Sequence, residues 1–93
     1  MLDIRYTRRA IEHLTSAYEY IYRDDPDSAR NVITRIEKSI TAIRDYPELG
    51  KAGRRPGTRE LLTTKAPFII VYRYEENCIV ILAILHTSRQ YRI

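Results

Sequence analysis

The sequence has little of what holds a secreted or membrane-embedded protein together. Its single cysteine, Cys78, cannot form a disulfide within the chain, as is typical of proteins in a reducing compartment. The start of the chain lacks the basic region and apolar run of a secretory signal peptide. The apolar stretch 68–85 is interrupted by Arg73, Glu75 and Glu76, which argues against a membrane span. We therefore expect a cytoplasmic protein with no membrane partner.

Patterns of metal ligands and of activated nucleophiles are also missing. His13, His86 and Cys78 do not have the spacing of a metal site, so we expect no metal or other cofactor. Nothing arranges Ser88 or Cys78 with a base, so a serine or cysteine hydrolase has no support. Any chemistry of this chain must use other groups.

Acidic residues are scarce in the second half of the chain. Residues 1–50 contain eight Lys or Arg and nine Asp or Glu, a net charge of −1, whereas residues 51–93 contain eight Lys or Arg and three acids, a net charge of +5. This excess favours an acidic partner there, either nucleic acid or an acidic protein segment. A solubilising surface explains the same charge equally well.

The first half of the chain predicts a strand and two helices. Alternation in residues 2–6 predicts a short strand, and apolar residues spaced by three and four over residues 8–23 predict a helix. Asp25 is a suitable N-cap for a second helix that begins at Pro26, and this helix ends before Pro47. A turn of two or three residues then forces the helices to pack antiparallel as a hairpin.

The second half of the chain predicts strands. Residues 47–57 contain two Pro and three Gly and predict a loop, which Lys51, Arg54 and Arg55 make basic. Residues 59–64 predict a strand, and two apolar runs separated by the polar step 75–77 predict a β-hairpin. With its 93 residues, the chain is expected to form a single domain over residues 1–93.

This order of elements predicts an α+β fold. We expect an N-terminal strand, the antiparallel helical hairpin and then a three-stranded antiparallel meander, with the helices on one face of a sheet of three to four strands. Alternation in the first hairpin strand separates Ile70, Tyr72 and Tyr74 from Ile69, Val71 and Arg73. A guanidinium is rarely buried without a partner, so Arg73 marks the face that the helices leave open. We expect His86 and the residues after it, up to Tyr91, to lie toward a partner on that side as well.

Three segments of this chain resemble the RelE/ParE superfamily of toxins from bacterial toxin–antitoxin pairs. They are Tyr46-Pro47-Glu48-Leu49-Gly50 leading to Gly57-Thr58-Arg59-Glu60-Leu61, then Pro67-Phe68-Ile69-Ile70-Val71-Tyr72-Arg73, and finally Ile81-Leu82-Ala83-Ile84-Leu85-His86-Thr87-Ser88-Arg89. The resemblance covers almost the whole chain and implies a type II toxin that is neutralised by an antitoxin encoded beside it. A toxin homodimer or a toxin–antitoxin hetero-oligomer is then expected.

The resemblance implies two different targets. RelE-like members are ribonucleases that cut messenger RNA on the ribosome, whereas ParE-like members poison DNA gyrase. Ile69 lies where RelE-like nucleases usually carry an arginine, so this chain looks ParE-like and the expected partner is gyrase rather than the ribosome and mRNA. A ribosome-dependent endoribonuclease remains one alternative, and a diverged member that binds its antitoxin with little toxicity is another.

The candidate site residues follow from these hypotheses. A nuclease would use Arg73, Arg89 and His86, because RNA cleavage needs proton transfer and positive charge at the phosphate. The following residues are expected to bind the antitoxin or the target: Arg54, Arg55, Arg59, Arg73, Arg89 and Tyr91. A structural role is the simpler explanation for His86, and Arg89 is equally compatible with a solvated tail.

Overall fold

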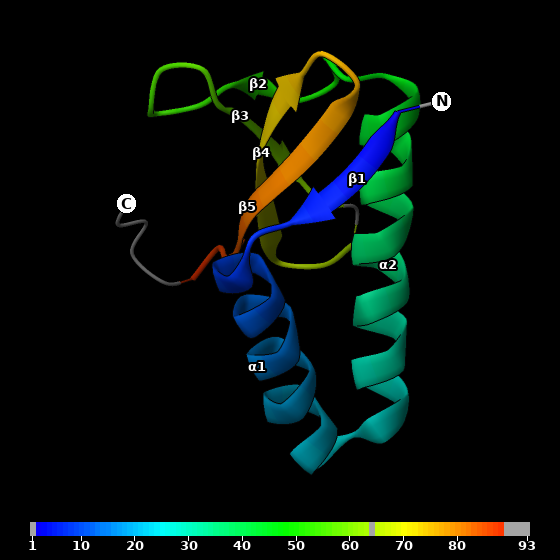
Figure 1. Cartoon of the computed structure of the whole chain (residues 1–93). Coiled ribbons are helices and arrows are strands. Elements are labelled where there is room, and N and C mark those ends of the chain that lie inside the picture. The colour runs from blue at the N-terminus through cyan, green and yellow to red at the C-terminus, as the bar shows by residue number, and fades with distance from the viewer. Residues whose placement is uncertain (1, 64, 89–93) are drawn as a thin grey trace.

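A computed structural model describes residues 2–63 and 65–88 of the chain. The elements are β1 (Asp3–Tyr6), α1 (Arg8–Asp24), α2 (Pro26–Asp45), β2 (Lys51–Ala52), β3 (Arg59–Leu62), β4 (Phe68–Glu75) and β5 (Cys78–His86). The strands form one sheet in the order β1-β5-β4-β3-β2, in which β1 runs parallel to β5 and the other neighbours are antiparallel. The two helices form a hairpin whose turn projects beyond the sheet (Figure 1).

The predicted α+β fold is confirmed, including the N-terminal strand, the helical hairpin and the meander of β3, β4 and β5. The predicted number of strands was wrong, because the sheet has five strands rather than three or four. The additional strand, β2, lies inside the stretch predicted as a loop and pairs only two residues with β3. A strand this short contains no alternating pattern that a sequence could show.

Asp25 ends one helix and begins the next. Its backbone N–H donates to the carbonyl of Ile21 at 3.0 Å, and its carboxylate accepts from the backbone N–H groups of Asp27 and Ser28 at 3.1 and 3.2 Å. The predicted N-cap is therefore confirmed, although the turn consists of this one residue rather than two or three. Neither helix in the described part of the chain is long and apolar enough to cross a membrane.

Thr7 attaches the start of α1 to β5. The Thr7 hydroxyl caps the helix by accepting from the backbone N–H of Ala10 at 3.1 Å, and it donates to the carbonyl of Leu82 at 3.1 Å. The backbone N–H of Thr7 also donates to the carbonyl of Ile81 at 3.0 Å. One short side chain thus satisfies a helix end and positions that end against the sheet.

The core lies between the helices and one face of the sheet. Ile70 and Tyr72 belong to it, as predicted, and both are fully buried. Tyr74 was predicted to face the helices in the same way, but it is 49% exposed near the end of β4. The buried members of the core are Ala10, Ile36, Ile40, Ile43, Ala66, Phe68, Ile70, Tyr72, Ile79, Ile81 and Ile84.

A β-bulge interrupts the pairing of β4 with β5. Val71 pairs with Ala83 and Tyr72 pairs with Ile81, so Leu82 has no partner in β4. One extra residue in a strand reverses which side chains face each side of the sheet beyond it. Before the bulge Ile81 faces the helices, and after it His86 does, opposite Phe68.

Candidate functional site

The loop between α2 and β3 is fastened to the sheet by two side chains. The Tyr72 hydroxyl donates to the carbonyl of Pro47 at 2.7 Å and accepts from the backbone N–H of Gly50 at 2.9 Å. The Arg59 guanidinium donates to the carbonyl of Gly50 at 2.8 Å and, more weakly, to that of Glu48 at 3.4 Å. The guanidinium of Arg59, which was predicted to bind a partner, is therefore used inside the molecule.

Gly50 has no room for a side chain. A Cβ atom at this position would lie 2.8 Å from the Tyr72 hydroxyl and 2.9 Å from the carbonyl oxygen of Glu60. Both distances are shorter than a real Cβ contact. The first of the segments on which the resemblance depends therefore has a structural role, because it closes this loop against Tyr72.

A depression of about 460 Å³ lies on the face of the sheet that the helices do not cover. Leu62 on this face is 63% exposed, whereas Val71 and Ala83, which pair across β4 and β5, are each 1% exposed. The residues that line the depression are Lys51, Ala52, Gly53, Arg54, Glu60, Leu62, Ile69 and Thr87. Two basic side chains and an apolar floor therefore meet on the open face.

Glu60 lines this depression, although it was not among the predicted site residues. Its side chain is buried, and its carboxylate accepts from the backbone N–H of Arg54 at 3.0 Å. The signal was present in the sequence, because alternation along β3 places Glu60 on the face opposite to Leu61. This contact holds the basic loop that carries Arg54 and Arg55 at the border of the open face.

The predicted binding residues do not all lie together. Arg54 lines the depression and Arg55 is exposed in the same loop. Arg73 lies on the open face as predicted, near the far end of β4, where it forms an ion pair of 3.3 Å with Glu75. Both side chains of that pair are about half exposed, so the pair contributes little stability. Arg89 and Tyr91 lie outside the described residues.

His86 lies on the helix-covered face and not beside Arg73, which corrects the expected arrangement. Its ring packs edge-on against Phe68 with ring centroids 5.2 Å apart. Arg73 pairs with Val80, five β4 residues away from the Phe68–His86 pair, or roughly 17 Å along the strand. The bulge at Leu82 is the reason, because it reverses the alternation before His86 is reached.

The hydrogen bonds of His86 involve one of its ring nitrogens. Its Nδ1 atom accepts from the backbone N–H of Ser88 at 3.1 Å. The neutral ring must then carry its proton on Nε2 and present a donor, not a base. The Ser88 hydroxyl lies 2.6 Å from the same nitrogen.

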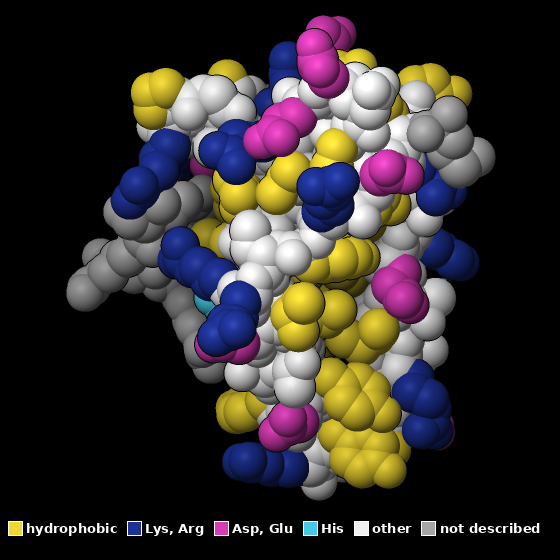
Figure 2. All heavy atoms as spheres, viewed as in Figure 1, with side chains coloured by type: hydrophobic (Ala, Val, Ile, Leu, Met, Phe, Trp, Pro, Cys, Tyr) yellow, Lys and Arg dark blue, Asp and Glu magenta, His cyan; other side chains and the backbone are white. Residues whose placement is uncertain are grey.

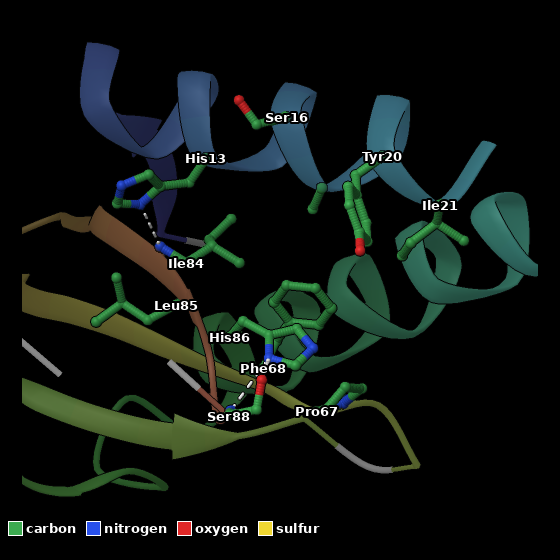
Figure 3. A pocket seen from close by; sticks show the side chains of 11 residues that line it. His13, Ser16, Tyr20, Ile21, Pro67, Phe68, Ile84, Leu85, His86 and Ser88 are labelled. Atoms are coloured by element: carbon green, nitrogen blue, oxygen red, sulfur yellow. Dashed lines mark hydrogen bonds between the residues drawn. The ribbon is translucent and has the colours of Figure 1, made fainter. Parts of the chain in front are cut away.

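A cavity of about 580 Å³ separates α1 from the ends of β4 and β5. Figure 3 shows His13, Ser16 and Tyr20 of α1 on one side of it and Ile84, Leu85 and His86 on the other. The Nδ1 atom of His13 crosses this gap to accept from the backbone N–H of Ile84 at 3.1 Å. Burial lowers the pKa of His13, and the nearby charge of Arg9 lowers it further, against a smaller opposing effect of Glu12.

The surface of the hairpin is apolar in part. Ile11 and Tyr22 of α1 are 52% and 45% exposed, and the ring centroids of Tyr18 and Tyr22 lie 5.5 Å apart. Figure 2 shows hydrophobic side chains gathered where the two helices lie side by side, with basic and acidic side chains interspersed around them.

In the part of the chain that the structure describes, no three His, Cys, Asp or Glu side chains cluster as metal ligands would.

Comparison with known proteins gives the family. Residues 4–91 match the family model of the ParE toxin of the type II toxin–antitoxin system parDE. The chain belongs to the ParE toxin family. It is 40% identical over 88 residues to the Y4kP protein of Sinorhizobium fredii, a match that covers 95% of this chain and 91% of that protein.

Other relatives of this ParE-family toxin agree with the fold. Toxin RelE2 of Caulobacter vibrioides is 27% identical over 89 residues, which cover 96% of this chain and 99% of that one. A chain of the chromosomal ParDE toxin–antitoxin system from P. aeruginosa superposes with a TM-score of 0.83 at 24% identity, covering 92% of this chain and 96% of that chain. The chain is therefore the toxin component of a type II system, and its partner is a cognate antitoxin.

Proposed function

We propose that this ParE-family toxin acts in the cytoplasm by inhibiting DNA gyrase, and that it does so with the open face of its sheet. The observation that carries the proposal is the separation of Arg73 from His86, which lie on opposite faces of the sheet and near opposite ends of the β4–β5 ladder. A ribonuclease needs its proton-transfer group and its phosphate-binding cation to converge on one phosphate. Binding to a protein–DNA complex makes no such demand.

The environment of His86 also supports a role without catalysis. Its Nδ1 atom is occupied by the backbone N–H of Ser88, so the neutral ring has no lone pair available for a 2′-hydroxyl proton. On the open face, Ile69 lines the depression at the position where RelE-like nucleases usually carry an arginine. An isoleucine cannot stabilise the negative charge that builds up on a phosphate during cleavage.

The open face instead has the character of a binding surface. Arg54 and Lys51 border an apolar floor, Leu62 is largely exposed, and Arg55 extends from the same loop. Basic residues around an apolar centre attract acidic surfaces over a distance and then bury apolar area on contact. The antitoxin and the target would compete for this surface, which would explain how the antitoxin neutralises the toxin.

Two assays run side by side test the target. Purified toxin is added to a gyrase supercoiling reaction and, separately, to a translation reaction in which mRNA cleavage is mapped. We expect loss of supercoiling and intact mRNA. Cleaved mRNA with unaffected gyrase would refute the proposal in favour of the nuclease, and no effect of folded toxin in either assay would favour a member that only binds its antitoxin.

A pair of matched variants tests the surface. Arg55→Ala and Arg23→Ala each remove one exposed arginine, the first beside the open face and the second in the last turn of α1. Only Arg55→Ala should weaken gyrase inhibition and antitoxin binding, and its effect should shrink at high salt because exposed charges are screened. His86→Ala should leave gyrase inhibition intact. Equal effects of the two arginine variants would refute the assignment of the open face.

A further inference from the structure

Among the described residues, only the first part of β5 has a neighbouring strand on its outer side. The strand runs from Cys78 to His86, but β1 pairs with residues 78–81 alone. From there on, α1 takes the place of a strand along this edge. The Thr7 hydroxyl binds the carbonyl of Leu82, and the Nδ1 atom of His13 accepts from the backbone N–H of Ile84 at 3.1 Å.

The contact between His13 and Ile84 depends on protonation. A neutral imidazole can accept at Nδ1 while Nε2 carries the proton, whereas an imidazolium has donors at both nitrogens and accepts at neither. Protonation therefore does more than break this bond, because it places an N–H group against the N–H group of Ile84. The strand edge then loses its only partner at that position among the described residues.

The contact lies at the border of a cavity. The cavity of about 580 Å³ lies beside His13, and its far wall contains Phe68 and His86 (Figure 3). α1 contributes Ala17 and Ile21 to the lining, and both side chains also pack against the core. The hydrogen bond across this gap therefore adds to the apolar contacts that hold α1 against the sheet.

We propose that the hydrogen bond between His13 and Ile84 holds α1 against the part of β5 that β1 does not pair with. Protonation of His13 breaks this bond, releases the helix and opens the cavity beneath it. The proposal concerns the movement of α1 and does not depend on which target the toxin has. The groups of α1 that face His13 are Arg9, which opposes protonation, and Glu12, which favours it. Across the cavity lies the ring of His86.

The direction of the pH effect follows from the position of the equilibrium. Burial lowers the pKa of His13 in the folded protein below the ordinary value of 6.5, so the unfolded or opened state takes up the proton first. The closed position of α1 on β5 is therefore at its most stable above pH 6.5. Below pH 6.5, the equilibrium constant for closed over opened α1 falls by up to about tenfold per pH unit, until His13 becomes protonated in the closed state as well.

Hydrogen exchange of the Ile84 amide directly measures the hydrogen bond between Ile84 and His13. The protection factor of this amide is followed from pH 7.5 to pH 5, with the buried Ile70 in the β4–β5 ladder as the internal reference and with the His13 ring titrated by NMR. His13→Asn keeps an acceptor at the position of Nδ1 but cannot titrate. His13→Phe keeps an aromatic ring but has no acceptor.

We expect Ile84 protection to fall on acidification in the wild type and to stay constant in His13→Asn, relative to Ile70. At pH 7.5, His13→Phe should lower Ile84 protection by about two- to tenfold, as the loss of one hydrogen bond predicts. An equal fall in the wild type and His13→Asn would overturn the proposal. So would constant protection in the wild type, full protection of Ile84 in His13→Phe, or a folded-state pKa of His13 at or above 6.5.

Discussion

Replacing Tyr72 with phenylalanine removes one oxygen atom from the centre of the loop closure. The hydroxyl of this fully buried residue donates to the carbonyl of Pro47 at 2.7 Å and accepts from the N–H of Gly50 at 2.9 Å. The ring and its packing remain, so the variant creates almost no cavity. It leaves a buried N–H group and a partly buried carbonyl without their partner.

The cost can be worked out from these two groups. A buried polar group that loses its partner costs about 1–3 kcal/mol, less where water can replace the partner. Gly50 is buried and Pro47 is only half-buried, so we expect Tyr72→Phe to lower the free energy of unfolding by about 2–4 kcal/mol. For a domain of this size, each kcal/mol corresponds to a fall of about 4–8 °C in Tm.

Equilibrium urea unfolding, followed by circular dichroism, measures the effect. A second variant, Arg59→Met, removes the single nitrogen, Nη1, that donates to the carbonyls of both Glu48 and Gly50, and it keeps an apolar side chain. Both changes release the same loop, so the double variant should be more stable than additivity predicts, by about 1 kcal/mol. The slope of unfolding free energy against urea concentration should stay constant, because the core is unchanged.

Two results would refute this reasoning. A loss below about 0.5 kcal/mol in Tyr72→Phe would mean that the hydroxyl does not hold the loop, since such a value is typical of surface substitutions. Strict additivity with Arg59→Met would mean that Tyr72 and Arg59 act on separate parts of the structure. Either outcome would also contradict the structural role of residues 46–50, which belong to the first segment that resembles the toxin family and which close the loop against Tyr72.

Three further predictions concern the caps and the loop. Thr7→Ala should lower the unfolding free energy by about 1–2 kcal/mol in urea unfolding, because it removes a helix cap and the bond to Leu82, whereas Thr7→Ser should retain most of it; equal losses would contradict this. Hydrogen bonds from Ser28 lower the pKa of Asp25 below its ordinary value of 3.8, so its contribution is present above pH 3.8 and is lost as the pH falls through the lowered pKa. Asp25→Asn keeps the cap and should show a smaller loss of Tm on acidification, and an identical acid profile would exclude Asp25 as the cause. Gly50→Ala should cost about 1–3 kcal/mol in the same unfolding assay, because the added methyl group meets the carbonyl of Glu60, and a neutral result would show that the loop can move away.

Helices and long strands were predictable because their signals are local. The spacing of apolar residues predicted a helix over residues 8–23, and the structure has it at Arg8–Asp24. The cap at Asp25 and the stop before Pro47 were likewise visible as residue types with a known backbone preference. By contrast, β2 pairs only two residues and depends on contacts with β3 that no local pattern contains.

The candidate site was only partly predictable, because the face of a residue depends on strand register. Arg73 was placed correctly on the open face from its charge alone. Arg59 was taken as a binding residue, although alternation with Leu61 already assigns it to the helix side, where it holds the loop. His86 could not have been placed, because the sequence gives no sign of the extra residue in β5.

The extra residue in β5, Leu82, shifts the register of the strand by one position, so that each later side chain points to the other face of the sheet. Every position from Leu82 to Leu85 is apolar, so this stretch of strand can adopt either register without exposing or burying a charge. The Thr7 hydroxyl binds the carbonyl of Leu82, the residue that has no partner in β4. The extra residue therefore places His86 on the helix side of the sheet, where it lines one cavity with His13.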